Sequence, residues 1–470
     1  MPKSRNMGTI KPKELSKLGY KDNTARSLAI EIIARHCKHT SNEDIMATLA
    51  DVLAYPENYK QDAVWSRLAE VIAPDKPEVS TYDLRNKPLS YIIYGEEQID
   101  ELPKNQIEMA MRLPVTIAGA LMPDGCAGYG LPIGGVLATE GVVVPYAVGL
   151  DIACRMCLTI LDAAPDYFEK HHDRAVEALV NNTAFGLDGT VPSKSYHPLF
   201  DKSEFRDIPL LRDLRSKAVR QFGSSGKGNH FVDICEVQLS DGNALGVSGG
   251  SYVGILSHSG SRGMGATIAE HFTTIAKETC RLPRQAGPFA WLDLNTQEGQ
   301  EYWRCMEIAG EYSAANHECI HTNVAKALRL KPLTAISNHH NFAWREILPD
   351  GIEVIVHRKG ATPAHAGELG LIPGSMATPG FIITGKGCEQ SLYSASHGAG
   401  RTMSRQDARN TFSRYAMNKF LAERNITLIG GTTEEAPLAY KDIEQVMAAQ
   451  SELVNIEGKI IPRIVRMSEE

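Results

Sequence analysis

The stretch SYVGILSHSG, residues 251–260, is a short β-rich run that ends in a polar, glycine-rich turn. Three more runs have the same texture, and they lie at residues 141–149, 352–360 and 380–387. Helical patterns separate these runs, the longest from about Gln297 to Leu330 and another over about residues 403–424. Strand-like runs that alternate with helices in this way predict a mixed α/β fold, a single large body of β-sheets flanked by helices.

The first 76 residues have a different character. They contain three amphipathic helical patterns, TARSLAIEIIARHCKH from Thr24, SNEDIMATLADVL from Ser41 and NYKQDAVWSRLAEVI from Asn58. Thr24 and Ser41 are residue types that cap helix N-termini. Residues 73–88 carry three prolines and predict a linker. We therefore expect a helical N-terminal appendage over residues 1–76 and a main domain over residues 77–470.

Length and composition exclude several classes of protein. The chain has 470 residues and a net charge of −7, and no apolar run approaches the roughly 20 residues of a membrane-spanning helix. Its basic N-terminus lacks the apolar centre of a signal peptide. The nine cysteines are scattered and odd in number, which indicates a reducing compartment without disulfides. We expect a cytoplasmic protein. Its negative charge argues only weakly against a nucleic-acid partner, because a local basic patch can outweigh net charge.

Most of the polar chemistry of the main domain lies in five short segments, each at the end of a β-like run or in a glycine-rich turn. They are residues 148–155, 226–233, 256–263, 337–344 and 394–401. They offer a carboxylate, a thiol and four imidazoles, namely Asp151, Cys154, His230, His258, His340 and His397. Imidazole suits first-row transition metals, and the carboxylate favours a harder ion such as manganese. A buried cysteine is more often a small apolar residue, and a lone histidine more often hydrogen-bonded, so the residues alone leave a metal site and a structural role open.

Nine short motifs occur in the order seen in one enzyme family. They are MPDGCAGYGLPIGG (122–135), VGLDIAC (148–154), GNHF (228–231), HSGSRG (258–263), HHNFAW (339–344), HRKGA (357–361), IPGSM (372–376), SHGAGR (396–401) and AYKDIEQVMAAQSELV (439–454). Over roughly residues 88–470 the chain resembles RtcB-type RNA-splicing ligases. The resemblance implies that residues 77–470 form an RtcB-like catalytic domain.

The resemblance also implies an activity. Such enzymes join RNA that ends in a 2′,3′-cyclic phosphate or 3′-phosphate to RNA with a 5′-hydroxyl, in RNA repair or tRNA splicing. They use GTP and two manganese ions. A histidine is guanylylated first, GMP then passes to the RNA 3′-phosphate to give RNA-3′-pp-5′-G, and the 5′-hydroxyl finally releases GMP. The expected partners are therefore GTP and RNA, while the need for an activating protein stays open.

Each expected site residue follows from its position in a motif. His397 would be the nucleophile, and the small residues around it leave room for ribose and phosphates. The resemblance implies that the two ions share Cys154, with His258 and His340 completing one ion and Asp151 and His230 the other. The expected nucleotide-binding residues are Asn229, Asp233, Ser375, His397, Gly398, Gly400 and Tyr440. Asp124, Arg155 and Arg401 are further functional positions; Arg401 would steady phosphate charge or form a structural salt bridge.

The chain departs from the family pattern at several positions. Cys126 replaces a histidine of the first motif, which we expect to alter support more than catalysis. Asp233 stands where the family has glutamate, one methylene longer, so selectivity for guanine is weakened if this residue contacts the base. The chain ends in IVRMSEE where relatives end in a lysine and a glycine, so Arg466 is only an approximate substitute for that lysine. Arg155 stands where glycine is common and would contact RNA phosphate.

Two other function classes remain. HECIH, residues 317–321, fits the H-E-x-x-H pattern of zinc metalloproteases, with Glu318 as the base. No suitable third ligand follows it, and the pattern lies midway in a long amphipathic helix, where solvated polar residues suffice. The other class is a catalytically inactive, RNA-binding ligase homologue that serves the N-terminal helices. Those helices themselves would be a structural cap or a selector for a particular RNA or protein partner.

Overall fold

The computed structural model describes residues 10–73, 79–186, 189 and 197–469, and the statements below concern these residues. The chain divides into two compact units, Met1–Glu78 and Val79–Glu470. Residues 74–78 of the expected linker lie outside the described residues, whereas residues 79–88 belong to the second unit. In the described ranges, no helix combines the length and the apolar composition that crossing a bilayer requires.

The first unit is helical, as the sequence predicts. Its helices are α1 (Pro12–Leu18), α2 (Asn23–His36), α3 (Asn42–Ala54) and α4 (Ser66–Ile72). Ser41 caps α3, but α2 begins one residue before Thr24 and is capped by Asp22. The third expected helix is shorter than its pattern, and α1 was not anticipated. Leu15, Leu49 and Leu68 are fully buried in one apolar cluster, so this unit has a core of its own.

The larger sheet of the second unit is nearly closed. Its strands follow the order β11–β6–β8–β7–β19–β16–β15, and β18 pairs with β19. The bounds are β6 Arg155–Leu161, β7 Phe231–Leu239, β8 Gly250–Ser259, β11 Pro332–His339, β15 Leu369–Ile372, β16 Gly380–Gly385, β18 Thr427–Ile429 and β19 Val454–Met467. The side-chain amide of Asn338 on β11 accepts from the Leu371 N–H of β15 at 3.0 Å and donates to its carbonyl at 3.3 Å. The two outer strands are therefore joined through one side chain.

The second sheet has the order β12–β13–β4–β3–β2. The bounds are β2 Ile92–Ile93, β3 Thr116–Cys126, β4 Ile133–Thr139, β12 Asn341–Ile347 and β13 Glu353–Lys359. Next to it, β14 (Ala361–Pro363) pairs with β17 (Ser394–Ser396), which leads directly into His397. Two further short pairs are β1 (Ser80–Thr81) with β9 (Cys280–Arg281), and β5 (Val142–Val143) with β10 (Leu292–Asp293). Sheets and helices together confirm the predicted mixed α/β class.

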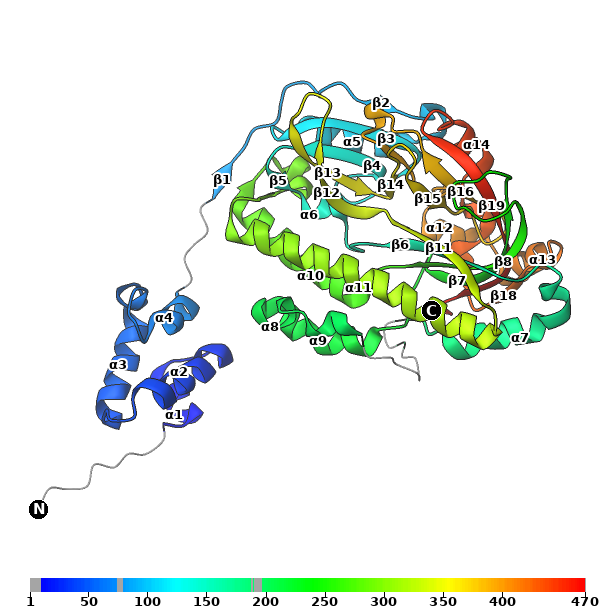
Figure 1. Ribbon diagram of the computed structural model, residues 1–470. Helices are drawn as coiled ribbons and strands as arrows, with labels where there is room; N and C mark the ends of the chain where they lie inside the picture. The colour runs from blue at the N-terminus through cyan, green and yellow to red at the C-terminus, as the bar shows by residue number, and fades with distance from the viewer. Residues whose placement is uncertain (1–9, 74–78, 187–188, 190–196, 470) are drawn as a thin grey trace, which may run out of the picture. The chain divides into compact units, whose positions relative to one another are not determined.

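Helices pack around the sheets of the second unit (Figure 1). Their bounds are α5 Glu101–Met111, α6 Pro145–Val148, α7 Tyr167–Asn182, α8 Glu204–Asp207, α9 Pro209–Gln221, α10 Arg262–Thr279, α11 Gln297–Leu328, α12 Arg405–Thr411, α13 Arg414–Ala422 and α14 Ile443–Ala448. Helix α11 matches the longest predicted pattern, and it lies beside α10 in Figure 1. Phe272 of α10 and Tyr302 of α11 are fully buried against each other, with ring centroids 5.2 Å apart.

Two expected elements differ from the structure. The pattern over residues 403–424 forms two helices, α12 and α13, because Ser413 between them caps the second one by accepting from the Ala416 N–H at 3.1 Å. The β-rich run at residues 141–149 is a strand only at Val142–Val143 and continues as α6, which starts at Pro145. Proline fixes φ near the helical value and is favoured in the first turn of a helix.

Candidate active site

A cavity of about 810 Å³ lies in the second unit and gathers residues from segments far apart in the sequence. Its walls come from the loop after β3, the ends of β7, β8 and β19, the turn at residues 373–380 and the stretch at residues 397–405. The expected site residues that line it are Asn229, Asp233, His258, Ser375, His397, Gly398, Gly400, Arg401 and Tyr440. The other expected metal ligands and Asp124 contact His258 or His397 directly or through one neighbour.

His397 is oriented by a buried carboxylate at the end of β3. The Oδ2 atom of Asp124 lies 2.6 Å from His397 Nδ1, and it also accepts the backbone N–H groups of His397 at 3.1 Å and Gly398 at 3.3 Å. Because a carboxylate only accepts, Nδ1 carries a proton, and in the neutral ring the lone pair is therefore on Nε2. Gly400 has φ of +72°, and a Cβ there would lie 2.2 Å from the Asp124 carbonyl oxygen. Only glycine therefore allows this loop to close on Asp124.

One thiol joins two groups of metal-ligating atoms. Cys154 Sγ lies 3.1 Å from His258 Nε2 and 3.3 Å from His230 Nε2. His258 Nε2 is 3.2 Å from His340 Nε2, and His230 Nε2 is 2.9 Å from Asp151 Oδ2. Within each triplet the ligand atoms all lie within 4.8 Å of one another, and Cys154 belongs to both triplets. These triplets have the composition of the two ligand sets that the resemblance implies.

The groups around these side chains favour metal binding by the donor atoms. His258 donates its Nδ1–H to the Asn229 carbonyl at 3.0 Å, so its Nε2 lone pair faces Cys154. The Nδ1 atoms of His230 and His340 are buried without a hydrogen-bond partner. Two glycines make room for the ligands, since a Cβ at residue 226 would lie 1.9 Å from His230 Nδ1 and one at residue 260 would lie 1.9 Å from Asp151 Oδ1.

Burial keeps two imidazoles of the cluster, those of His258 and His340, neutral. It lowers the pKa of His258 to about 3, and it holds the pKa of His340 well below the ordinary value. Neutral imidazole is the form that binds metal ions. Burial and the nearby Asp151 carboxylate raise the pKa of the Cys154 thiol, so a bound cation is required to hold it as a thiolate. The His340 and His397 rings lie 4.9 Å apart, which places the cluster directly beside His397.

One end of the cavity is apolar around a single carboxyl group. Asp233 is buried there, and burial raises its pKa well above the ordinary range. The apolar lining residues are Phe231, Leu256, Met376, Ile460, Pro462, Val465 and Met467. Arg466 is absent from this lining, because its guanidinium donates to the Leu179 carbonyl and lies 5.7 Å from the Phe185 ring. Arg466 therefore does not take the place of the chain-end lysine that the resemblance implies.

Arg401 forms a structural ion pair, which was one of its two expected roles. Its Nη1 lies 3.1 Å from Glu435 Oε2, and its Nη2 donates to the Glu434 carbonyl at 2.7 Å. Tyr440 donates to the same Glu435 carboxylate and stacks near Arg401, 5.1 Å from ring centroid to guanidinium carbon. Ser375 is held by Thr378, whose hydroxyl lies 2.9 Å from the Ser375 hydroxyl.

Arg155 does not line the cavity. It donates to Ser337 at 2.9 Å and lies 2.9 Å from His339 Nδ1, both on the neighbouring strand β11. Two cations that do line the cavity were not singled out from the sequence, Lys359 and Arg405. Lys359 lies in the quoted motif HRKGA, which was a usable signal. Burial lowers the pKa of Lys359 to about 8.

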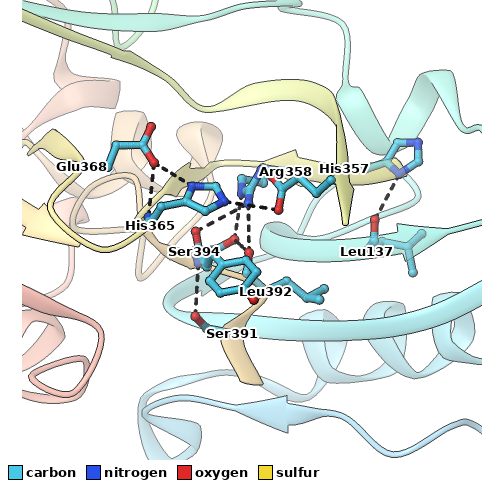
Figure 2. A network of polar contacts seen from close by, with 10 residues as sticks. Leu137, His357, Arg358, His365, Glu368, Ser391, Leu392 and Ser394 are labelled. Carbon is cyan, nitrogen blue, oxygen red and sulfur yellow. Dashed lines mark hydrogen bonds and ion pairs between the residues drawn. The ribbon is translucent and has the colours of Figure 1, made fainter. Parts of the chain in front are cut away.

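A buried arginine supports the strand that precedes His397 (Figure 2). Arg358 is fully buried, and its Nη1 lies 2.6 Å from Glu346 Oε1. Its Nε donates to the Ser394 hydroxyl of β17 at 2.7 Å, and its Nη2 donates to the Leu392 carbonyl at 2.9 Å. Figure 2 shows His365 beside this arginine, where its Nδ1 lies 2.8 Å from Glu368 Oε2. The start of β17 is thus held by one charged network.

The H-E-x-x-H pair occupies the other side of β8. His317 and His321 are buried, so the expectation of solvated residues is wrong for them, and only Glu318 is exposed. The Ser257 hydroxyl lies 2.6 Å from His317 Nδ1 and 2.7 Å from His321 Nε2. His317 donates its Nε2–H to the Ser259 carbonyl at 3.1 Å, and Thr159 lies 2.7 Å from His321 Nδ1. These two histidines and Cys157 form a further triplet of metal-ligating type, but every imidazole nitrogen already has a hydrogen-bond partner. Because the Glu318 side chain is exposed while both histidines are buried, Glu318 cannot serve as the base beside them, and these residues do not form the zinc-protease arrangement.

Comparisons with known proteins agree with the motifs. A family model described as tRNA-splicing ligase RtcB matches residues 106–208 and 207–467. The RNA-splicing ligase RtcB of Escherichia coli strain K12 is 32% identical over 376 residues, which cover 72% of this chain and 86% of that protein. The tRNA-splicing ligase RtcB of Thermococcus kodakarensis is 26% identical over 462 residues, covering 82% and 96%. The RNA-splicing ligase RtcB of Mycobacterium tuberculosis is 30% identical over 436 residues, covering 76% and 98%.

Proposed function

Since the chain belongs to the RtcB family of tRNA-splicing ligases, we propose that it is an RNA ligase that joins a 3′-phosphate or 2′,3′-cyclic phosphate end to a 5′-hydroxyl end through a guanylylated His397. One observation carries the proposal. His397 lines the cavity beside a cluster of Asp, Cys and His side chains, and its Nδ1 is held by the buried Asp124, which leaves Nε2 as the nitrogen available for attack. A nucleophile oriented by a third group is the arrangement that covalent catalysis requires.

The first step is the attack of His397 on GTP. The Nε2 lone pair forms a bond to the α-phosphorus, and the bond from that phosphorus to the bridging oxygen breaks, releasing pyrophosphate. Asp124 holds the Nδ1 proton throughout and offsets the positive charge that develops on the imidazole. Because the side chain of Asp124 also accepts two backbone N–H groups of the loop, the ring is held in one orientation before the reaction begins.

The second and third steps join the RNA ends. An oxygen of the RNA 3′-phosphate attacks the phosphorus of the His397 adduct, which gives RNA-3′-pp-5′-G and returns His397 to its free form. The 5′-hydroxyl of the other strand then attacks the RNA 3′-phosphorus, a phosphodiester forms and GMP leaves. A 2′,3′-cyclic phosphate end must first be opened by water to a 3′-phosphate.

The metal ligands fit two manganese ions. His258 and His340 would hold one ion, Asp151 and His230 the other, and Cys154 both. Mixed thiolate, imidazole and carboxylate donors suit manganese better than magnesium, which prefers oxygen ligands. When bound, such ions neutralise the charge of phosphate groups. The chain itself orients His258 through the Asn229 carbonyl and keeps His340 neutral by burial.

The apolar end of the cavity would hold the base of GTP. Its single carboxyl group, Asp233, is a hydrogen-bond partner for the edge of a purine, and Ser375 and Tyr440 line the same cavity. Without a counterpart of the chain-end lysine of the family pattern, discrimination between guanine and adenine rests on fewer polar groups than that pattern implies. We therefore propose GTP as the co-substrate, with weaker selectivity than the family pattern implies.

A ligation assay tests the function. Purified protein is incubated with GTP, manganese and two RNA oligonucleotides, one with a 3′-phosphate and one with a 5′-hydroxyl. We expect a joined product that requires both end groups, and no product from a 3′-hydroxyl strand. Product formation by wild-type protein rules out the inactive homologue. If RNA binds but neither a joined product nor RNA-3′-pp-5′-G forms, the inactive RNA-binding homologue is the correct interpretation.

A further inference from the structure

Tyr129 presents an exposed aromatic ring at the same cavity. Its side chain lines the cavity, yet the residue is 76% exposed, which places the ring on the rim. Among the described residues, no other ring and no cation packs on it, and its hydroxyl makes no hydrogen bond. Tyrosine is enriched at binding interfaces, and a ring at the mouth of this cavity stands where a ligand would enter.

The backbone around this ring is held firmly. Gln106 accepts the Gly128 N–H at 3.1 Å and donates to the Gly128 carbonyl. The next carbonyl, that of Tyr129, accepts from the Lys359 ammonium, which also donates to the Tyr146 carbonyl at 3.2 Å. Lys359 is buried, so it fixes two rim segments from within. The backbone of the loop is therefore anchored on both sides of the exposed Tyr129 ring.

A rigid, exposed ring is well suited to stacking. An aromatic side chain with few rotatable bonds loses little conformational entropy when a flat partner covers it. The partner must be planar and must enter from solvent. A nucleobase of a single-stranded RNA meets both conditions, and stacking on aromatic side chains is the usual way in which proteins hold such bases without reading sequence.

An exposed cation near the rim favours RNA as the occupant. Lys277 of α10 is exposed and lies 5.1 Å from the centroid of the Tyr146 ring on the adjoining rim segment, whereas the buried Lys359 ammonium is held by the Tyr129 and Tyr146 carbonyls. A phosphate chain that follows a stacked base therefore meets the positive charge of Lys277. The base of GTP has its own apolar end in the cavity, around Asp233, and that end is built from different strands, β7 and β19.

We propose that Tyr129 is a stacking platform for the nucleobase next to a reacting RNA end. The inference rests on the proposed function for the identity of the RNA, and either the 3′-phosphate strand or the 5′-hydroxyl strand supplies the base. Tyr129 acts by positioning, because its ring holds the strand and takes no part in bond formation. The assignment concerns binding of RNA and not formation of the GMP adduct.

Equilibrium binding tests the platform without catalysis. Fluorescent single-stranded RNAs with a 3′-phosphate or a 5′-hydroxyl end are titrated with the full-length protein. Loss of one stacked base should weaken binding of the stacking strand about tenfold in Tyr129→Ala. Tyr129→Phe keeps the ring and should bind as the wild type does. Tyr415→Ala is the matched control, because Tyr415 is 80% exposed and does not line the cavity.

Abasic probes identify the strand and the nature of the contact. Each RNA is also prepared without the base of its terminal nucleotide. The defect of Tyr129→Ala should disappear for the abasic form of one strand only, which is the strand that stacks. Binding of Tyr129→Ala within twofold of wild type would overturn the platform, as would a defect of equal size with intact and abasic forms of both strands. If ligation fails while Tyr129→Ala still binds the stacking strand more weakly than wild type, the proposed function is contradicted but the assignment of Tyr129 is not.

The rate of GMP labelling provides a second readout. Tyr129→Ala should form the His397 adduct at the wild-type rate, while the KM for RNA in ligation rises and kcat stays unchanged. A slower adduct would show that the ring serves the nucleotide, and it would overturn the assignment to RNA.

Discussion

Asp124 Oδ2 lies 2.6 Å from His397 Nδ1, and the carboxylate that makes this contact is fully buried at the end of β3. The contact occupies Nδ1, so Nε2 is the imidazole nitrogen that Asp124 leaves free. It also fixes the loop, because Asp124 accepts the N–H groups of His397 and Gly398 as well. His397, the proposed nucleophile, and Asp124 are separated by more than half of the sequence, and they meet because β17 brings residue 397 beside the end of β3.

Replacing Asp124 tests this relationship. Asp124→Asn keeps the size of the side chain, but its amide can present its NH₂ group to Nδ1 and so favour the wrong tautomer. We expect guanylylation to slow by about 100-fold or more, with the overall fold retained. The rate of label transfer from GTP to the protein measures the effect. An Asn variant that labels within threefold of wild type would mean that tautomer control by Asp124 is unimportant.

Removing the shared thiol tests the metal site. Cys154→Ser replaces a thiolate with a weak neutral ligand, so both ions should bind poorly and manganese content should fall. Elemental analysis after dialysis measures the manganese content, independently of activity. Cys305→Ser is the control, since Cys305 is buried in α11 and belongs to neither ligand triplet. Unchanged manganese in Cys154→Ser, or equal activity with magnesium alone, would require different ligands.

The network in Figure 2 predicts a pH dependence of stability. Hydrogen bonds to Glu346 and Glu368 raise the pKa of His365 to about 9. A group whose pKa is raised on folding stabilises fully below its unfolded value of about 6.5, and the contribution is lost as pH rises towards 9.

The comparison of wild type with His365→Gln isolates this contribution from the other titrating groups. The His365 side chain is 45% exposed, so solvent screening limits the effect to about 1 kcal/mol. Urea unfolding at several pH values measures the difference in free energy of unfolding between the two proteins. That difference should shrink between about pH 6.5 and 9. A difference that is constant over this range would contradict the ion pairing of His365.

The division of labour between the two units is a further prediction. All proposed site residues lie in the second unit, and the first unit has its own apolar core. A chain that starts at Val79 should therefore still take up GMP from labelled GTP, and its ligation of a short generic RNA should survive. If the first unit selects a substrate, affinity for the natural RNA should fall, and more so at low salt, because phosphate contacts are salt-dependent. A truncated protein that is folded yet cannot take up GMP would assign the first unit to catalysis.

The cluster of candidate metal ligands was the most predictable part of the candidate site. Each candidate ligand follows a β-rich run or lies in a glycine-rich turn, where the backbone positions side chains towards a cleft. The glycines beside them leave space for these side chains, as Gly226 does for His230. The residues could not reveal which atoms meet, because the contacts join strands that are far apart in sequence.

Other features depended on the direction in which a side chain points, and that direction is decided by packing. Alternation along β19 places Val465 and Met467 on the cavity side and turns Arg466 to the other face, so Arg466 does not replace the missing lysine. His317 and His321 sit in an amphipathic pattern, but their polarity is satisfied by Ser257 rather than by water. The helix pattern at residues 403–424 was also misleading, because a serine cap in its middle begins a new helix.

The most direct test of the account is whether His397 carries GMP. The protein is incubated with α-labelled GTP and manganese, and the label is mapped by acid and base treatment and by peptide analysis. We predict an acid-labile, base-stable phosphoramidate on His397, absent from His397→Ala although that variant remains folded. Undiminished labelling of His397→Ala, or label on another residue, would contradict the account.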